Sequence, residues 1–348
     1  MAVFVLNLEP IDTRYTGQWQ KGLPKEIMKE SGQVVIPING GKISSVTTEG
    51  AFLNFLDTNL WKNTQINKLV EMFKNKEVEP GDHILFPDGW HTGILQIKYI
   101  SELLNIPVKI HAIWHAGSYD PNDFLGRLIK DKNWTFNAER AMMYACDYNY
   151  VSTEYHKDLI ESELFFDMKS PNIIVSGLPF EYLWKTLKPY SQLPKRNLIL
   201  FPHRIAPEKQ VEIFKDLAGS FPDYEFVVCQ EQKLTKDQYH QLLGESKMVF
   251  SANLQETLGI SCIEAIICNS IPFVPDRLSY REMYDDVFKY PSRYTDSWEK
   301  YLENKDLIVK QMQELLEAYD LTKEFRAQSK KLKTQFCFPA KMYNNLCL

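Results

Sequence analysis

The sequence of 348 residues lacks several features that would place it in a specialised class of proteins. It has six cysteines but no Cys-x-x-Cys pair, which argues against a zinc site or a disulfide framework and favours reduced cysteines in the core of a cytoplasmic protein. No stretch approaches the roughly 18 apolar residues of a membrane span. The apolar run that begins at Met1 has no basic segment before it, so it predicts a first strand and not a signal peptide.

A strong charge imbalance and internal repeats are also missing. The net charge of -5 gives no global indication of binding to nucleic acid or to an anionic membrane. One local exception is the segment from Lys323 to Lys341, which holds six lysines and arginines. Such a run is more typical of a solvated helix face than of a binding site, and whether it binds anything stays open.

What the sequence does contain is an alternation of short apolar runs with longer amphipathic stretches, which is typical of parallel sheets covered by helices. The length exceeds one typical core and indicates two domains. We predict an α/β chain with a first Rossmann-like domain over 1–187, a linker over 188–196 and a second Rossmann-like domain over 197–320. A helical tail would occupy 321–348. The expected strands are Val3–Leu6, Gln33–Ile38, His83–Phe86, Val108–Trp114, Tyr148–Ser152, Ile173–Val175, Asn197–Phe201, Glu225–Cys229, Lys247–Ser251 and Ile271–Val274.

The segment from Glu256 to Glu264 carries the clearest chemical signal. Two carboxylates are separated by seven residues, with Gly259 at the expected start of a helix over Leu258–Cys268. A helix N-terminus offers free N–H groups and a positive dipole end, which suit a phosphate. Carboxylates accept hydrogen bonds, which suits sugar hydroxyls. Phosphate and polyol recognition side by side is what a nucleotide-sugar site requires.

This segment resembles the Glu-(seven residues)-Glu motif of retaining glycosyltransferases, especially family four. Upstream, Phe201–Lys209 is similar to the family's Gly-Arg-Leu-x-Pro-Glu-Lys segment, and downstream Ala265–Asp276 is similar to its Glu-Ala-Met-Ala-x-Gly-x-Pro-Val-Val segment. The resemblance implies the GT-B fold, in which two Rossmann-like domains face each other across a cleft and the last helix crosses back to the first domain. It also implies a hexosyl- or pentosyltransferase.

The resemblance assigns roles to particular side chains. Arg204 and Lys209 would neutralise the donor diphosphate, Glu264 would hold the ribose hydroxyls and Glu256 would lie beside the transferred sugar. Because the basic pair can replace a cation, and the sequence shows neither Asp-x-Asp at a strand end nor a His/Cys cluster, we expect no metal and no cofactor besides the nucleotide-sugar co-substrate. The phosphates would meet the backbone of Leu258, Gly259 and Ile260.

Two departures from the family lie near the expected site. Thr257 replaces a glycine, and its β-branched side chain restricts the backbone beside the sugar. The glycine-rich loop after the first strand is replaced by a long loop from Glu9 to Gly22, in which Gly17 is the best candidate for close backbone approach. His115, after the strand over Val108–Trp114, would touch the donor sugar.

The acceptor is the least defined part of the prediction. A saccharide or lipid-linked saccharide is the commonest acceptor of the family. The first alternative is a hydroxymethylated pyrimidine in DNA, as for viral enzymes of this fold, and the second is a module that binds nucleotide sugars or glycans without catalysis. The aromatic side chains that could stack on a sugar or on a flipped base are Trp19, Trp90, Trp114, Trp134 and Tyr119.

Overall fold

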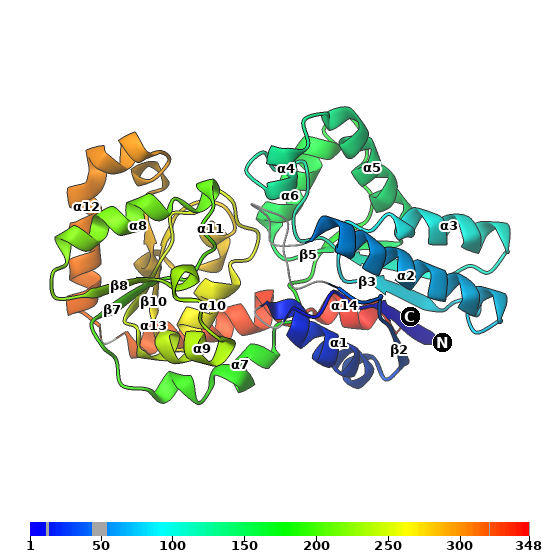
Figure 1. The fold of residues 1–348 in the computed structure, drawn as a ribbon, viewed down its shortest axis with the longest axis horizontal. Helices are drawn as coiled ribbons and strands as arrows, with labels where there is room; N and C mark the ends of the chain where they lie inside the picture. The colour runs from blue at the N-terminus through cyan, green and yellow to red at the C-terminus, as the bar shows by residue number, and fades with distance from the viewer. Residues whose placement is uncertain (12–13, 44–53, 320, 348) are drawn as a thin grey trace. The chain divides into compact units, whose positions relative to one another are not determined.

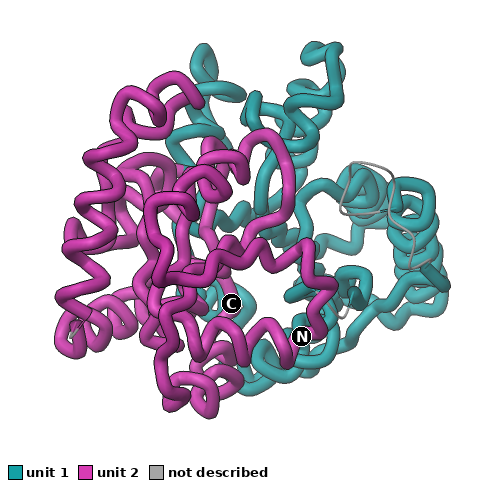
Figure 2. The backbone as a smooth tube through the Cα atoms, turned by 60° about the vertical axis from the view of Figure 1, so that its left-hand side comes forward, with its two compact units in different colours: residues 1–152, 156–176, 339–348 teal, residues 153–155, 177–338 magenta. Residues whose placement is uncertain are grey.

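The contacts of the chain divide it into two compact units (Figure 2). The structure, a computed structural model, describes residues 1–11, 14–43, 54–319 and 321–347. Unit 1 comprises Met1–Ser152, His156–Ser176 and Pro339–Leu348, and unit 2 comprises Thr153–Tyr155 and Gly177–Phe338. These limits differ from the expected domain limits, because residues 177–187 and the linker lie in unit 2.

Unit 1 is built on a parallel sheet of six described strands in the order β2-β1-β3-β4-β5-β6. β1 pairs with β2 on one side and with β3 on the other, so the direction of winding reverses between β1 and β3. In an open α/β sheet, ligands bind at the carboxyl ends of the strands at such a point. The strands are β1 (Ala2–Leu6), β2 (Val34–Ile38), β3 (His83–Phe86), β4 (Lys109–Ile113), β5 (Tyr148–Val151) and β6 (Ile173–Val175).

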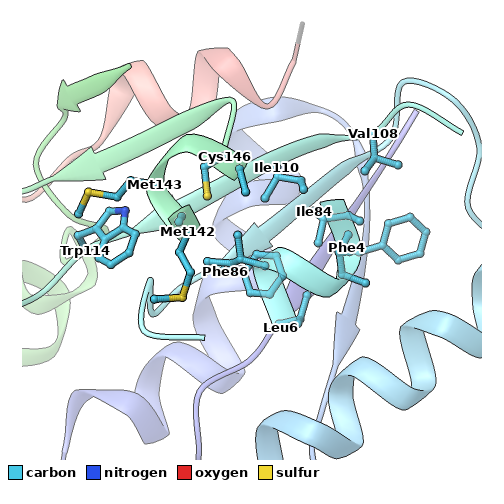
Figure 3. Close-up of a cluster of buried hydrophobic side chains, with 14 of the residues drawn as sticks. Phe4, Leu6, Ile84, Phe86, Val108, Ile110, Trp114, Met142, Met143 and Cys146 are labelled. Carbon is cyan, nitrogen blue, oxygen red and sulfur yellow. The ribbon is translucent and has the colours of Figure 1, made fainter. Parts of the chain in front are cut away.

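Helices cover both faces of this sheet. Figure 1 shows α1 and α14 on one face and α2 and α3 on the other. Alternate strand residues point to opposite faces, so Phe4 and Leu6 enter the core below α2 and α3, together with Ile84 and Phe86 of β3 (Figure 3). The helices are α1 (Tyr15–Ser31), α2 (Phe55–Lys74), α3 (Gly93–Leu103), α4 (Phe124–Leu128), α5 (Lys132–Ala145), α6 (Glu154–Leu164) and α14 (Ala340–Asn345).

The last residues, Pro339–Leu348, belong to unit 1, whereas residues 321–338 of the expected tail lie in unit 2. α14 packs against α1, and Cys347 Sγ lies 3.3 Å from the carbonyl oxygen of Ser31. Met342 is fully buried in this segment, and Lys341 donates a hydrogen bond to the carbonyl of Val175. The chain therefore returns to its first unit after completing the second one.

Unit 2 is a second parallel sheet, with five described strands in the order β11-β10-β9-β7-β8. β7 and β9 pair with each other, and β8 lies on the other side of β7 whereas β10 lies on the other side of β9. The direction of winding therefore reverses between β7 and β9. The strands are β7 (Leu198–Phe201), β8 (Glu225–Val228), β9 (Met248–Phe250), β10 (Ile271–Pro275) and β11 (Lys289–Tyr290). The helices are α7 (Tyr182–Leu187), α8 (Val211–Leu217), α9 (Lys236–Glu245), α10 (Ile260–Ile267), α11 (Tyr280–Met283), α12 (Trp298–Glu317) and α13 (Thr322–Lys331).

The expected strands all form, and β3 and β6 have the predicted limits. The helix expected over Leu258–Cys268 is observed as α10. The first loop is shorter than predicted, because α1 begins at Tyr15 and includes the position of Gly17. α1 also contains Pro24, which argues against a helix in sequence, but Trp19, Leu23 and Ile27 are buried along one face. Burial of that face outweighs the local cost of the proline.

Five of the six cysteines lie in the core, where the sequence predicts them. Cys146, Cys229, Cys262, Cys268 and Cys337 are free and buried, and Cys347 is partly buried. Over the described residues, no helix is long and apolar enough to cross a membrane. The same residues contain no group of three or more His, Cys, Asp or Glu side chains that could hold a metal ion.

All seven histidines of the sequence are buried or partly buried, and burial lowers the pKa of each one below the ordinary value of 6.5 because it disfavours the charged form. The pKa falls to about 3 for His91, His156 and His203. His83 and His111 lie in contact, with His83 Nδ1 and His111 Nε2 2.8 Å apart. Protonation of both rings would place two positive charges in contact in the core.

We therefore expect the protein to be labile in acid. Below about pH 6.5 the histidines of the unfolded chain bind protons, whereas those of the folded chain stay neutral. The free energy of unfolding therefore falls as the pH falls, by at most about 1.4 kcal/mol per pH unit for each such histidine. Glu139 and Glu264, whose pKa values burial raises, act in the opposite sense but are fewer. Denaturant unfolding at constant ionic strength between pH 8 and pH 5 measures the slope. A stability that stays level or rises on acidification would contradict the expectation.

Candidate functional site

The carboxyl ends of β7 and β9, where the winding of unit 2 reverses, bring together the segments singled out in the sequence. The segment after β7 contains His203, Arg204 and a short 3-10 turn over Pro207–Lys209. The segment after β9 contains Glu256. A backbone hydrogen bond of 2.8 Å from Leu254 N to the Glu208 carbonyl joins the two segments. The site in unit 2 is thus formed by two loops that are distant in sequence.

Lys209 and Glu256 are the central pair of this site. The Lys209 ammonium is buried, donates to the carbonyl of Gln255 at 2.6 Å and lies 3.4 Å from Glu256 Oε2. Burial acts to raise the pKa of Glu256, but the charge of Lys209, the neighbouring His203 and backbone N–H groups outweigh it, and the net pKa is lowered. Glu256 is therefore a carboxylate at neutral pH, and Lys209 is its counterion.

The Glu256 carboxylate also binds the backbone that precedes α10. Its Oε1 accepts from Thr257 N at 3.1 Å and lies at the hydrogen-bond limit, 3.5 Å, from Leu258 N. Gly259 is the N-cap of α10 and has a φ of 71°, a left-handed conformation that favours glycine. Consecutive N–H groups at a turn before a helix form an anion-binding concavity. In this structure a carboxylate occupies the place where the sequence predicts a phosphate beside Leu258, Gly259 and Ile260.

Arg204 also has an acidic partner. Its guanidinium forms an ion pair with Glu208, with Nε 3.1 Å from Oε1. Glu208 is buried, whereas the Arg204 side chain is 30% exposed, so the arginine can reach solvent-borne ligands. The charges of Arg204 and Lys209 balance those of Glu208 and Glu256, so a phosphate would have to compete with carboxylates for both cations.

Glu264 is placed on the second turn of α10 and is buried among residues of α9. Its Oε2 accepts from the Tyr239 hydroxyl at 2.9 Å, and its Oε1 lies 4.0 Å from His240 Nε2. Burial raises the pKa of Glu264, and the charge of Lys236 and the Tyr239 hydroxyl only partly oppose this. Glu264 therefore has a different set of neighbours from Glu256, and its role toward a ribose stays a prediction.

Sequence reasoning missed several polar residues of the same site. Asn253 is buried and donates to Glu256 Oε2 at 3.4 Å and to the Tyr280 hydroxyl at 3.0 Å. His203 is buried beside Lys209 and Glu256, and its Nε2 has no hydrogen-bond partner among the described residues. His203 lies inside the segment that resembles the family, so its position was visible in sequence. Tyr280 and Tyr239 come from other elements, and only the fold brings them here.

In unit 1, His115 lies after β4 at the carboxyl edge of the sheet, as the sequence predicts. Its Nε2 is 2.8 Å from the Pro87 carbonyl, so this nitrogen carries the proton. The ring packs against Tyr15 and Trp19, with centroids 5.8 and 5.7 Å away. Burial lowers its pKa despite the nearby charge of Asp88. The role of His115 toward a donor sugar stays a prediction.

Two further features of unit 1 correct or extend the sequence analysis. Gly17 lies in the first turn of α1 and is buried, so it is not part of an open loop, and its proposed approach to a ligand stays a prediction. Glu139, which the sequence did not single out, accepts from Ser118 N at 2.6 Å, from Ser118 Oγ and from Trp90 Nε1 at 2.8 Å. This buried carboxylate joins the loops that follow β3 and β4.

Several of the aromatic side chains expected to stack on a ligand are in the core instead. Trp19, Trp114 and Tyr119 are 1–2% exposed. Trp114 Nε1 donates to Asn149, and the Tyr119 hydroxyl contacts His156. These three side chains therefore stabilise the fold and do not offer a stacking surface.

No protein-family model matches the sequence, and no match was found among curated proteins. Solved structures do match. The chain is similar to sucrose-phosphate synthase from Thermosynechococcus elongatus, with a TM-score of 0.60 and 12% identity over 98% of this chain and 96% of that one. It is also similar to the catalytic domain of starch synthase IV from Arabidopsis thaliana bound to ADP and acarbose, with a TM-score of 0.59 and 12% identity over 99% and 98% of the two chains.

A third similar structure is the pneumococcal O-GlcNAc transferase GtfA in complex with UDP and GlcNAc, with a TM-score of 0.54 and 13% identity over 82% of this chain. The chain spans 60% of the length of GtfA. These neighbours are glycosyltransferases of the GT-B fold, and this chain has that fold, with two parallel Rossmann-like sheets. The fold predicted from the sequence is thereby confirmed, whereas membership of family four stays a prediction.

The conformation of Gly259 gives a test of the loop that carries Glu256. A Cβ at this position would lie 2.8 Å from Tyr280 Cε1, and φ is positive, so Gly259→Ala is expected to destabilise the protein by more than about 1 kcal/mol. Gly219→Ala is the matched control, because an added Cβ there would have no neighbour within 4 Å and its φ is not in the left-handed region. Thermal or denaturant unfolding measures both. Equal stability of the two variants would contradict the strain assigned to Gly259.

Proposed function

We propose that this chain is a retaining glycosyltransferase that moves a sugar from a nucleotide-diphosphate sugar to a hydroxyl of a saccharide or lipid-linked saccharide. The observation that carries the proposal is the cluster of Lys209, Glu256 and the turn before α10 at the reversal point of the unit 2 sheet. Cations, an anion-binding turn and buried carboxylates within one site suit a ligand with both phosphates and hydroxyls.

The donor would lie on unit 2. Its diphosphate would displace the Glu256 carboxylate from the N–H groups of Thr257 and Leu258 and take Lys209 and Arg204 as counterions. Released from these contacts, Glu256 would accept hydrogen bonds from the hydroxyls of the transferred sugar. Glu264, whose raised pKa follows from its burial, would accept from a ribose hydroxyl in place of Tyr239.

Transfer with retention needs no protein nucleophile. The bond between the anomeric carbon and the phosphate oxygen breaks, the acceptor oxygen bonds to the same face of that carbon, and the acceptor's proton passes to the departing phosphate. The leaving diphosphate gains negative charge in this step, so preorganised cations lower the barrier. Lys209 and Arg204 supply that charge, and we infer that the reaction needs no divalent metal.

The solved structures are consistent with this donor class. GtfA was solved with UDP and starch synthase IV with ADP, so proteins of the same fold hold nucleoside diphosphates. For the acceptor, burial of Trp19, Trp114 and Tyr119 removes most of the aromatic surface on which a flipped base of DNA would stack. The same observation does not affect a saccharide acceptor, which hydrogen bonds can hold.

Binding of the donor is the first test. We expect UDP-, ADP- or GDP-sugars to raise the unfolding temperature, because a ligand at a hundredfold excess over its Kd stabilises the folded state by about 2.7 kcal/mol. Glu264→Gln is expected to weaken nucleotide binding at least about tenfold, since it replaces a charge-assisted hydrogen bond by a neutral one. Glu212→Gln, at an exposed position of α8, is the control. No stabilisation by any nucleotide sugar would reject the proposal.

Turnover is the second test. With saturating donor, Lys209→Met is expected to lower kcat on the order of a hundredfold, because it removes a cation that acts on the developing charge. Lys215→Met, which changes an exposed lysine of α8, should keep kcat. The parent enzyme should turn over in a chelator. Full kcat in Lys209→Met would remove the leaving-group role, and loss of turnover in chelator that Mg²⁺ or Mn²⁺ restores would overturn metal independence.

A further inference from the structure

Unit 1 contains a small cavity at the reversal point of its own sheet. Three segments line it: the residues after β1, the residues after β3, and one face of α2. Its volume is about 10 Å³, which is room for about one oxygen-sized group. The lining residues are Leu6, Asn7, Leu8, Glu9, Trp61, Lys62, Gln65, Phe86, Pro87, Asp88 and His91.

Most polar groups around this cavity bind one another. The carbonyl of Asn7 accepts from Trp61 Nε1 at 2.9 Å and from Gln65 Nε2 at 2.8 Å. Lys62 Nζ donates to Asp88 Oδ2 at 2.8 Å and also contacts the Trp90 carbonyl. Burial raises the pKa of Asp88, but Lys62 more than offsets this, and the pKa falls to about 2. Lys62 and Asp88 thus form a neutral pair with little capacity for a charged ligand.

Two buried atoms in the lining have no partner among the described residues. These are Glu9 Oε1 and His91 Nε2, on residues that are 6% and 4% exposed. His91 Nδ1 accepts from Gly93 N at 3.1 Å, so in the neutral ring the proton is on Nε2. Both residues line the cavity, so its wall residues include one unused acceptor and one unused donor, and an unpaired buried polar group is destabilising.

The chemistry of the two atoms selects the ligand. An anion would bind His91 but would be repelled by Glu9, and a cation would bind Glu9 but would leave the His91 donor unused. A hydroxyl group donates one hydrogen bond and accepts others, so it can satisfy both atoms. The volume admits one such oxygen and excludes a larger group.

We propose that this cavity binds one hydroxyl group of a neutral polyhydroxy compound, with Glu9 Oε1 accepting its hydrogen and His91 Nε2 donating to its oxygen. The remainder of the compound would lie outside the cavity, along the carboxyl edge of β1 and β3. The identification of this compound as the sugar acceptor rests on the proposed function. Binding at the cavity requires neither a donor nor transfer.

The test follows His91 directly by NMR of the full chain labelled with ¹⁵N-histidine, with glucose and glycerol as probes. The His91 signal is assigned from its loss in His91→Asn. Both probes are expected to shift the Nε2 signal in a saturable way, whereas 1,2-dimethoxyethane, which has no hydroxyl, and inorganic phosphate should leave it unchanged. A signal that no hydroxyl probe shifts, as expected for an ordered water only, would overturn the proposal.

Variants of Glu9 give the second readout. Glu9→Leu is expected to weaken probe binding at least about tenfold because the acceptor is lost, and Glu9→Gln, which keeps an oxygen, should retain part of it. Glu71→Leu, at an exposed position of α2, is the control. Equal affinity for the probes in a folded Glu9→Leu variant and in the parent would overturn the proposal. If Glu9→Leu does not fold, the affinity of Glu9→Gln is compared with that of the parent, and equal affinity would again overturn it. Nucleotide binding to unit 2 is measured separately, so failure of one proposal leaves the other in place.

Discussion

The contact between the Lys209 ammonium and the Glu256 carboxylate is the interaction on which the unit 2 site depends. It joins the loop after β7 to the loop after β9, which the sheet order places side by side. Because Lys209 is buried, its charge requires a partner, and the pairing keeps Glu256 ionised. The carboxylate then holds the N–H groups before α10 in the position where they can bind an anion.

The same constraint, that buried polar groups must find partners, shapes the carboxyl edge of unit 1. Glu139 joins the loops after β3 and β4, and Lys62 pairs with Asp88. His115 uses its one donor on a backbone carbonyl. Glu9 Oε1 and His91 Nε2 have no such partner among the described residues, which is the basis of the hydroxyl site that we propose. Both sheets therefore carry their polar groups where the winding reverses, although the two sets of residues are unrelated in sequence.

The neighbours of this fold are only 12–13% identical to the chain, and the physical reason for the likeness lies in the pattern of burial. Strands such as β3, β7 and β9 are buried on both faces, so any large apolar side chain of suitable volume can replace another. At the carboxyl ends of the strands, charged side chains such as Lys209 and Glu256 depend on particular partners, so their residue types cannot be exchanged in the same way. The resemblance of the segments over 201–209 and 256–264 to the family motifs stays a prediction.

Sequence patterns predicted every described strand except the short β11, because short apolar runs between turn residues are typical of strands. They also singled out Lys209, Glu256 and Gly259, which lie in short contiguous segments and whose roles stay predictions. The partners of these residues depend on the folded chain. Glu139 meets Trp90 across 49 residues of chain, and no local pattern reports such a contact. Likewise α1 forms despite Pro24 because Trp19 and its neighbours are buried in the folded unit. The free energy of this burial is available only when the remainder of the unit has folded around the helix.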